Sequence, residues 1–285
     1  MFRLFTWSKA AYIILMVLWG GLIALWITNI IPDYIWWISF VASIAAELGI
    51  NALATKKYQK MLCRADTDID GFVMEQDALA ARQKGKLRQI VTANTIVALL
   101  EYERLDDVRN RLNLLSQMIP PNDFTGRFQY SSILMTLDMK CRNFQGIDFY
   151  VNDMNMCLSR FSAFNGGTEK LKRRCRFLIE MNLSSAEFFS RTPETLAAQD
   201  RNIAQRFLAD LEQYNLLNRD NKVFPGALVT DYLVGRGLAL AVLGDVENSR
   251  ASLYQAASLP YGYPLIARAK RCLETGDINI LFTAV

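Results

Sequence analysis

The sequence predicts an all-α protein in which an N-terminal transmembrane helical hairpin precedes a series of further helical hairpins. Three observations lead to this prediction. Two long apolar runs follow each other near the N-terminus, the remaining chain has apolar residues at helical spacing without a convincing strand, and glycines and prolines fall where that spacing breaks.

The two apolar runs are Ala10–Ile31 and Tyr34–Ala54. Each has the length that a helix needs to cross a hydrocarbon core of about 30 Å. Only Pro32 and Asp33 separate the runs, so the two spans are expected to be antiparallel with a tight turn outside the bilayer. A cleaved signal peptide is the competing interpretation, but the first run is longer than an ordinary signal core and no small-residue cleavage site precedes the second run. We therefore expect residues 1–64 to form a retained membrane anchor.

Basic residues predict the orientation of this anchor. Arg3 and Lys9 precede the first span, the turn between the spans carries no cation, and four basic residues follow the second span, namely Lys56, Lys57, Lys60 and Arg64. Loops rich in lysine and arginine stay on the cytoplasmic side. Both termini are thus expected in the cytoplasm, with residues 65–285 as a cytoplasmic helical domain and the three lysines on a continuation of the second helix at the membrane surface.

Polar residues recur at intervals of four in the second span, at Ser39, Ser43, Glu47 and Asn51. An acidic side chain within a membrane costs about 2.5–3.5 kcal/mol at the bilayer centre, so it usually faces protein. Glu47 and Asn51 are therefore candidates for binding a polar group of a partner membrane subunit. Alternatively, they lie close enough to the inner headgroups for water to reach them. The first span offers Gly20, Gly21 and Ala24 at a similar depth, a small surface that would let the two helices approach closely.

Composition excludes several function classes. The chain of 285 residues contains no histidine, which excludes Ser-His-Asp and Cys-His nucleophile systems and His-ligated metal sites, and no Walker loop or dinucleotide fingerprint is present. We therefore expect no enzymatic activity, and a carboxylate-only or lysine-based enzyme is the alternative that the composition leaves open. A formal charge of +4, part of it juxtamembrane, does not indicate a nucleic-acid partner. The five cysteines form no CxxC pair, which is typical of reduced, mostly buried thiols.

The segment from Asp66 to Asp77 resembles the calcium loop of EF-hands, or the dockerin variant that ends in aspartate. Acidic residues stand at loop positions one, three, five and twelve, with glycine at position six: Asp66, Asp68, Asp70, Asp77 and Gly71. Alternate oxygen ligands of this kind can surround a calcium or magnesium ion. The alternative is a helix start, with Asp66 or Asp70 as the cap of the first turn and Phe72, Val73, Leu79 and Ala80 facing inward.

The helical pattern continues to the end of the chain. The predicted helices are Asp70–Lys84, Leu87–Tyr102, Asp106–Met118, Phe128–Lys140, Gly146–Phe161, Glu169–Phe189, Pro193–Tyr214, Gly226–Leu243, Val246–Ser258 and Pro264–Glu274. Gly85, Gly166-Gly167, Pro193, Pro225 and Pro264 fall at breaks or first turns, where these residues are favoured. The apolar tail Ile278–Val285 is expected to pack on the final helix pair.

The helical hairpins repeat a pattern. After a short turn, the second helix carries inward residues at offsets of four and three, as in Val108, Leu112 and Leu115. The same offsets recur in Ile147, Val151 and Met154 and again in Ser249, Leu253 and Ala256. These spacings place the side chains against the preceding helix.

This pattern over Leu87–Ser258 resembles the tetratricopeptide repeat, with Gly237 and Gly244 at the small and turn positions of the last unit. The resemblance implies a tetratricopeptide-like α-solenoid whose first helices line a groove for a peptide or helix of a protein partner. Charged and polar residues on or near the expected first helices are the candidate groove residues: Arg88, Asn94, Arg127, Lys170, Arg173, Arg174 and Arg236. A plain helical bundle, with these residues solvated, is the alternative.

Two functions are compatible with this organisation. The first is a scaffold that binds a protein partner through the repeat groove and confines it to the bilayer, which raises the partner's effective concentration there. The second is an accessory subunit of a transport or export complex that binds through Glu47, Asn51 and the small residues of the first span. A metal-sensing protein using the acidic loop is a third hypothesis.

Overall fold

A computed structural model describes residues 6–28, 33–161, 169–218 and 224–283. All regular structure in these ranges is helical, with fourteen α-helices, one 3-10 turn and no strand. The predicted all-α class is therefore confirmed for the described residues. The break expected at Pro32 and the one at Gly166-Gly167 lie outside them.

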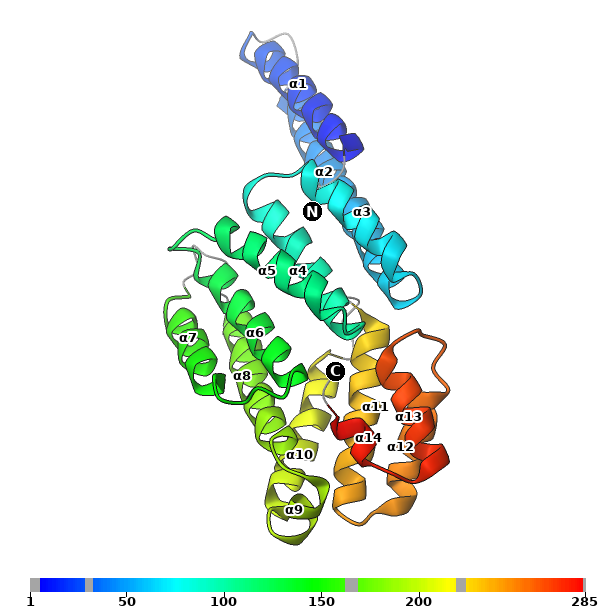
Figure 1. The fold of residues 1–285 in the computed structure, drawn as a ribbon. Coiled ribbons are helices and arrows are strands. Elements are labelled where there is room, and N and C mark those ends of the chain that lie inside the picture. Colours follow the sequence, from blue (N-terminus) through cyan, green and yellow to red (C-terminus); the bar gives the residue numbers. More distant parts are fainter. Residues whose placement is uncertain (1–5, 29–32, 162–168, 219–223, 284–285) are drawn as a thin grey trace.

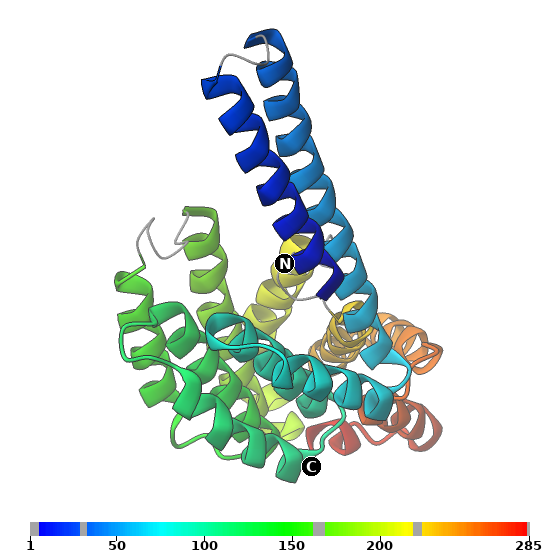
Figure 2. The ribbon, with the colours of Figure 1, turned by 90° about the horizontal axis from the view of Figure 1, so that it is seen from above.

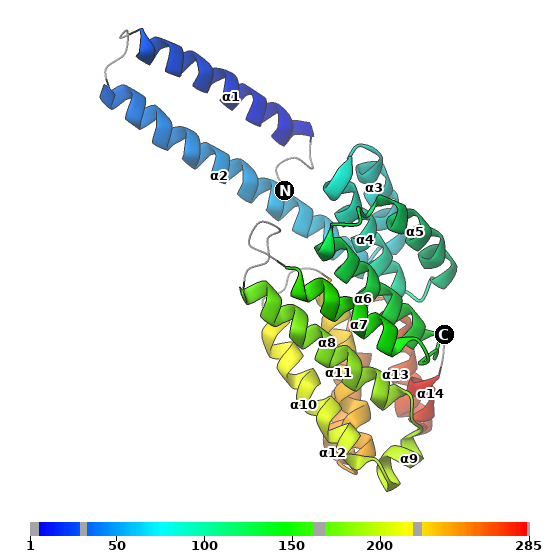
Figure 3. The same ribbon diagram turned by 90° about the vertical axis from the view of Figure 1, so that its left-hand side faces the viewer.

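The first two helices, α1 (Thr6–Ile27) and α2 (Asp33–Cys63), lie side by side and project away from the other helices (Figure 3). Both are long and apolar enough to cross a membrane, and no residue of the apolar stretch Ala10–Ile27 is buried within the protein. Large side chains meet between the helices, where the rings of Trp19 and Phe40 are 5.3 Å apart.

Helix α2 continues beyond its apolar part into the body of the molecule, as the sequence predicts for the segment that carries the three lysines. Ala54, Tyr58 and Leu62 lie four residues apart on one stripe, and all three are buried. Tyr58 and Leu62 join a hydrophobic cluster with Phe72 and Tyr263. One continuous helix therefore connects the projecting pair to the core of the body.

The next helices are α3 (Ile69–Ala81), α4 (Gly85–Glu101), α5 (Leu105–Met118), α6 (Phe124–Lys140) and α7 (Ile147–Ser159). The inward residues predicted for α5 and α7 are buried, except Val151, which is half-buried. Helix α6 begins four residues before the predicted Phe128. The reason is a cap: the Asp123 carboxylate accepts a hydrogen bond of 3.0 Å from the main-chain N–H of Gly126.

The C-terminal half contains α8 (Glu169–Phe189), α9 (Pro193–Ala198), α10 (Arg201–Asn218), α11 (Pro225–Val242), α12 (Val246–Ala257), α13 (Pro264–Thr275) and α14 (Asn279–Phe282). The single helix predicted for Pro193–Tyr214 is wrong, because α9 ends before α10 begins. The N–H of Asp200 turns back to the carbonyl of Thr195, and Leu196 of the short α9 is fully buried. Burial of this turn outweighs helix continuation, and the break contains neither glycine nor proline.

Two glycines fit the places that the repeat pattern assigns to them. A Cβ at Gly237 would lie 2.7 Å from Cγ of Leu253, so only glycine permits the close approach of α11 and α12. The hydroxyl of Ser249 donates to the carbonyl of Gly237 at 2.7 Å across the same contact. Gly244 has a φ of +84° in the following turn, a conformation that favours glycine.

A buried carboxylate joins the end of α2 to the C-terminal helices. Asp66, in the 3-10 turn Arg64–Asp66 after α2, is only 4% exposed. It accepts a hydrogen bond of 3.1 Å from the N–H of Gly226 in the first turn of α11, and a second one from the hydroxyl of Tyr263. An anion at this position satisfies a free N–H group and the positive end of the helix. Asp66 thus connects segments that are far apart in the chain.

The C-terminal helix α14 makes a second long-range connection. The ring of Phe282 packs on Phe188 and Phe189 of α8, at centroid distances of 5.4 and 5.7 Å, and its carbonyl accepts a hydrogen bond from Arg142. The tail therefore reaches α8 in addition to the final helix pair on which it was expected to pack. The helices of the body follow one another along an arc, with α14 returning to its inner side (Figures 1 and 2).

Asp66→Ala should lower the free energy of unfolding by about 2–3 kcal/mol, because it leaves the Tyr263 hydroxyl and the Gly226 N–H buried without an acceptor. Thermal unfolding followed by circular dichroism at 222 nm measures the change. Asp106→Ala, at a 97% exposed carboxylate, is the matched control and should change stability little. Equal effects of the two substitutions would contradict the structural role of Asp66.

Candidate functional site

The body contains a cavity of about 610 Å³, partly open to solvent, on the inner side of the arc. Helices α4, α6, α8, α10, α11, α13 and α14 line it, mostly with apolar side chains such as Leu100, Ile133, Met181, Phe207, Leu211 and Leu238. A mainly apolar cavity of this size with a few polar groups is the usual form of a ligand site. It is therefore the candidate functional site.

Helical periodicity explains which residues reach the cavity. On α11, Leu228, Asp231, Gly235 and Leu238 are spaced by three, four and three residues, so they share one face. On α6, Ile133, Thr136 and Lys140 do the same. The opposite faces of both helices pack on neighbouring helices, which leaves these stripes to form the cavity wall.

Two ion pairs lie on the wall. The Lys140 ammonium is 3.5 Å from a carboxylate oxygen of Glu101, and Arg268 is paired with Glu103. Burial by itself would lower the pKa of Lys140, but the neighbouring carboxylates, Glu101 first, outweigh it and raise the pKa. Lys140 is therefore a cation already matched by Glu101.

Asp231 has no such match. It makes no hydrogen bond or ion pair with any described residue. Asp231 is exposed to solvent where the cavity opens, although protein atoms lie close around its carboxylate. Burial raises the pKa of Asp231 to about 8, with a further contribution from Glu101, while Lys140 opposes the shift. The carboxylate is thus in an environment that disfavours its charge.

Two hydrogen-bond donors on the wall are also unmatched. Asn182 of α8 is 9% exposed and its Nδ2 has no partner, and Nε of Arg268 has none. Buried polar atoms are nearly always paired in folded proteins. The described part of the wall therefore presents an unpaired acceptor and unpaired donors together.

The candidate groove residues from the sequence do not line this cavity. Asn94 donates to the Tyr58 hydroxyl at 2.8 Å, and Arg127 is 2.6 Å from Asp153. Arg236 donates to Ser252 on α12. The remaining arginines, Arg88, Arg173 and Arg174, are exposed, and the side chain of Lys170 lies outside the described residues.

Sequence reasoning missed Glu101, Lys140 and Asp231, although one signal was available. Each lies on an otherwise apolar face of its helix, where a charge is costly without a partner. The groove residues predicted from the sequence are mostly cations on the first helices, whereas the cavity wall contains both signs of charge.

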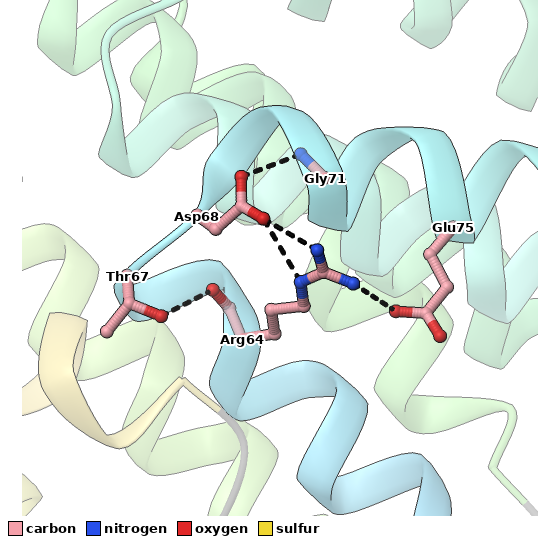
Figure 4. A network of polar contacts seen from close by, with 5 residues as sticks. All are labelled: Arg64, Thr67, Asp68, Gly71 and Glu75. Atoms are coloured by element: carbon pink, nitrogen blue, oxygen red, sulfur yellow. Dashed lines mark hydrogen bonds and ion pairs between the residues drawn. The ribbon is translucent and has the colours of Figure 1, made fainter.

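The acidic loop is arranged as a helix start (Figure 4). Asp68 caps α3 by accepting from the N–H of Gly71 at 2.9 Å, and it pairs with Arg64 at 2.7 Å. The cap is therefore Asp68, so the prediction of Asp66 or Asp70 in that role is wrong. An Asx-type cap reaches three residues ahead, which suits Asp68 because α3 begins at Ile69.

The four carboxylates proposed as metal ligands bind four different partners. Asp70 pairs with Arg104, Asp77 pairs with Arg111, and Asp66 binds α11 as described above. Among the described residues, no group of three or more His, Cys, Asp or Glu side chains could hold a metal ion. The loop therefore does not present a joint cation site in this structure.

The polar and small residues of the two long helices lie on outer surfaces. Glu47 and Asn51 are exposed, as are Gly20, Gly21 and Ala24. A Cβ at Gly20 or Gly21 would meet nothing within 4 Å, so these glycines do not mediate the expected close approach of α1 and α2. The bulky pair Trp19 and Phe40 occupies the contact instead.

Comparison of the chain with family models, with curated proteins and with solved structures finds no match in any of the three.

Asp231→Asn should stabilise the protein, and more so at pH 8 than at pH 5. Because the pKa of Asp231 is higher in the folded protein than in the unfolded chain, its contribution to stability declines as the pH rises through the folded pKa. An asparagine side chain does not ionise, so its contribution to stability does not decline with pH. With allowance for screening by water in the cavity, about 1 kcal/mol is expected at pH 8, or a melting temperature about 2–4 °C higher.

Thermal scans at the two pH values measure this change, with Asp106→Asn on the outside of α5 as the control. A lower melting temperature for Asp231→Asn at both pH values would mean that its carboxylate holds the fold together.

Proposed function

We propose that the protein is a membrane-anchored scaffold that binds a segment of a protein partner in the cavity of a tetratricopeptide-like α-solenoid. The observation that carries the proposal is the composition of the wall. Helices α4, α6 and α11, the first helices of the pairs α4/α5, α6/α7 and α11/α12, line the cavity, while no residue of α5, α7 or α12 does so. Repeat arrays use their concave surface to bind partners in the same way.

A membrane hairpin of α1 and α2 supports the tethering part of the proposal. Lipid would cover the apolar side chains that these helices expose, among them Ile13, Val17, Leu18, Ile38 and Val41, which are more than half exposed. Tethering needs a firm connection between anchor and groove. The buried stripe of Ala54, Tyr58 and Leu62 supplies one, because α2 belongs to both parts.

The mechanism is binding without chemistry. Confining a groove to the cytoplasmic surface of a bilayer raises the concentration of the bound segment relative to membrane proteins, with no new contact needed. The polar groups of Asp231, Asn182 and Arg268 that have no partner in the described part of the cavity fit this role, because a bound polypeptide can form hydrogen bonds or an ion pair with them. The absence of histidine excludes the histidine-dependent catalytic systems.

A second candidate function is an accessory subunit of a membrane complex that binds through the hairpin. Glu47 favours it, because this carboxylate is exposed on α2 and has no partner among the described residues. It lies about 10 Å from the inner end of the predicted span at Ala54. A cation or donor on another membrane helix would offset the cost of its burial in lipid.

Epitope tags at the two ends should both be protected from protease added outside intact cells and cleaved after permeabilisation, because the basic flanks keep both ends in the cytoplasm. Immunoblotting measures the loss of each tag. Cleavage of either tag in intact cells would contradict the two-span topology, and so would recovery of the chain in the soluble fraction without detergent.

A photoreactive amino acid at Val229, on the cavity wall, should form a discrete covalent adduct in native membranes, whereas one at Leu114 on the outside of α5 should not. Both side chains are about half exposed, at 41% and 52%, so exposure alone does not distinguish them. Adducts of equal yield at both positions, or none at Val229, would contradict binding in the cavity.

The two candidate functions are separated by replacing residues 10–50 with an unrelated membrane hairpin, which keeps the buried Ala54. If the cavity binds the partner, the adduct at Val229 should persist in this variant. If the original hairpin binds the partner, the adduct should be lost.

A further inference from the structure

The wall of the cavity has a definite charge pattern. Glu101 and Glu103 each have a cationic partner, Lys140 and Arg268, so these four charges cancel. Arg142, at the edge of the cavity, has no ion pair in the described residues, but it donates to the carbonyl of Phe282 and lies 5.6 Å from the centre of the Phe144 ring. Asp231 is left as an acidic group with no ion-pair partner in the described part of the chain, and a bound cation would favour its ionised form.

The uncharged polar groups add a second requirement. Nδ2 of Asn182 is a donor without an acceptor, on a side chain that is 91% buried, since 9% is exposed. An occupant that offers no acceptor to this nitrogen binds more weakly, because the nitrogen is then shut off from water without a hydrogen bond. A fitting occupant therefore brings an acceptor for Asn182, a cation for Asp231, and an apolar body for the rest of the wall.

We propose that the segment bound in the cavity carries a lysine or arginine between apolar residues, with its cation held by Asp231 and one of its main-chain carbonyls accepting from Asn182. This inference rests on the proposed function and specifies its partner. A polypeptide offers all three features in a short length, because every residue supplies a carbonyl. An acidic segment would supply no cation and would disfavour the ionised form of Asp231 still further, so it is not the expected occupant.

Asp231 is exposed to solvent within the open cavity, so water weakens its attraction to a cation. The surrounding protein still lowers the local dielectric below that of bulk water. Loss of the carboxylate is therefore expected to weaken binding about fivefold, which is about 1 kcal/mol. Asp231 is therefore expected to contribute to binding while it lowers the stability of the unbound protein, a conflict that is common at functional sites.

A random peptide library displayed on phage, selected against the full chain in lipid nanodiscs and counter-selected against empty nanodiscs, tests the proposal without knowledge of the partner. The expected result is enrichment of peptides with a lysine or arginine flanked by apolar residues. Synthetic peptides from the selection should bind Asp231→Asn about fivefold more weakly by fluorescence anisotropy. They should bind the control Asp106→Asn as tightly as the original protein.

The outcomes distinguish this inference from the proposed function. Enriched apolar peptides that lack a cation, or that bind Asp231→Asn unchanged, would overturn the inference and leave the groove intact. Enrichment of acidic peptides would also overturn it. If no peptide is enriched over empty nanodiscs, the peptide-binding function itself fails. Asn182→Leu provides an independent check, because it should weaken the same peptides while Leu114→Ala, outside the cavity, should not.

Discussion

The hydrogen bonds of the Asp66 carboxylate are the constraint on which the rest of the structure depends. They join the end of α2 to the first turn of α11 and to Tyr263, segments separated by 160 and 197 residues. The rings of Tyr102 and Tyr263 pack 4.8 Å apart beside them, and the Tyr102 hydroxyl donates to the carbonyl of Ala65. This junction reinforces the hydrophobic cluster in which Tyr58 and Leu62 of α2 pack against Phe224 and Tyr263, so the first and last parts of the arc are joined by both polar and apolar contacts.

The arc of helices leaves a cavity on its inner side, beside the hydrophobic clusters of the core. The two helices of each of the pairs α4/α5, α6/α7 and α11/α12 pack against each other, and one stripe each of α4, α6 and α11 remains to line the cavity. Residues from α13 and α14 approach from the C-terminal end and complete the wall. Glu101 and Glu103 are paired with cations on other helices, which offsets the cost of placing their charges on the wall. The polar groups of Asp231 and Asn182 have no such partner among the described residues and can bind an occupant.

Local features could be predicted from the sequence to a large extent. Most helices, the inward positions of α5, α7 and α12, and the continuation of the second span follow from periodicity and from turn residues. The errors have identifiable causes. The break between α9 and α10 has no glycine or proline, the start of α6 depends on the cap at Asp123, and the capping role of Asp68 depends on where α3 begins.

The candidate site was much less predictable, because a cavity wall is built from residues on seven helices whose partners are not neighbours in the chain. Glu101 is matched by Lys140, Glu103 by Arg268, and Asp66 by Tyr263, and none of these pairs has a sequence signature. The sequence by itself determined the all-α class and the faces that each helix buries, since periodicity and capping are local. The tertiary structure alone decided which charges meet and which remain unpaired, since that depends on how distant helices are brought together.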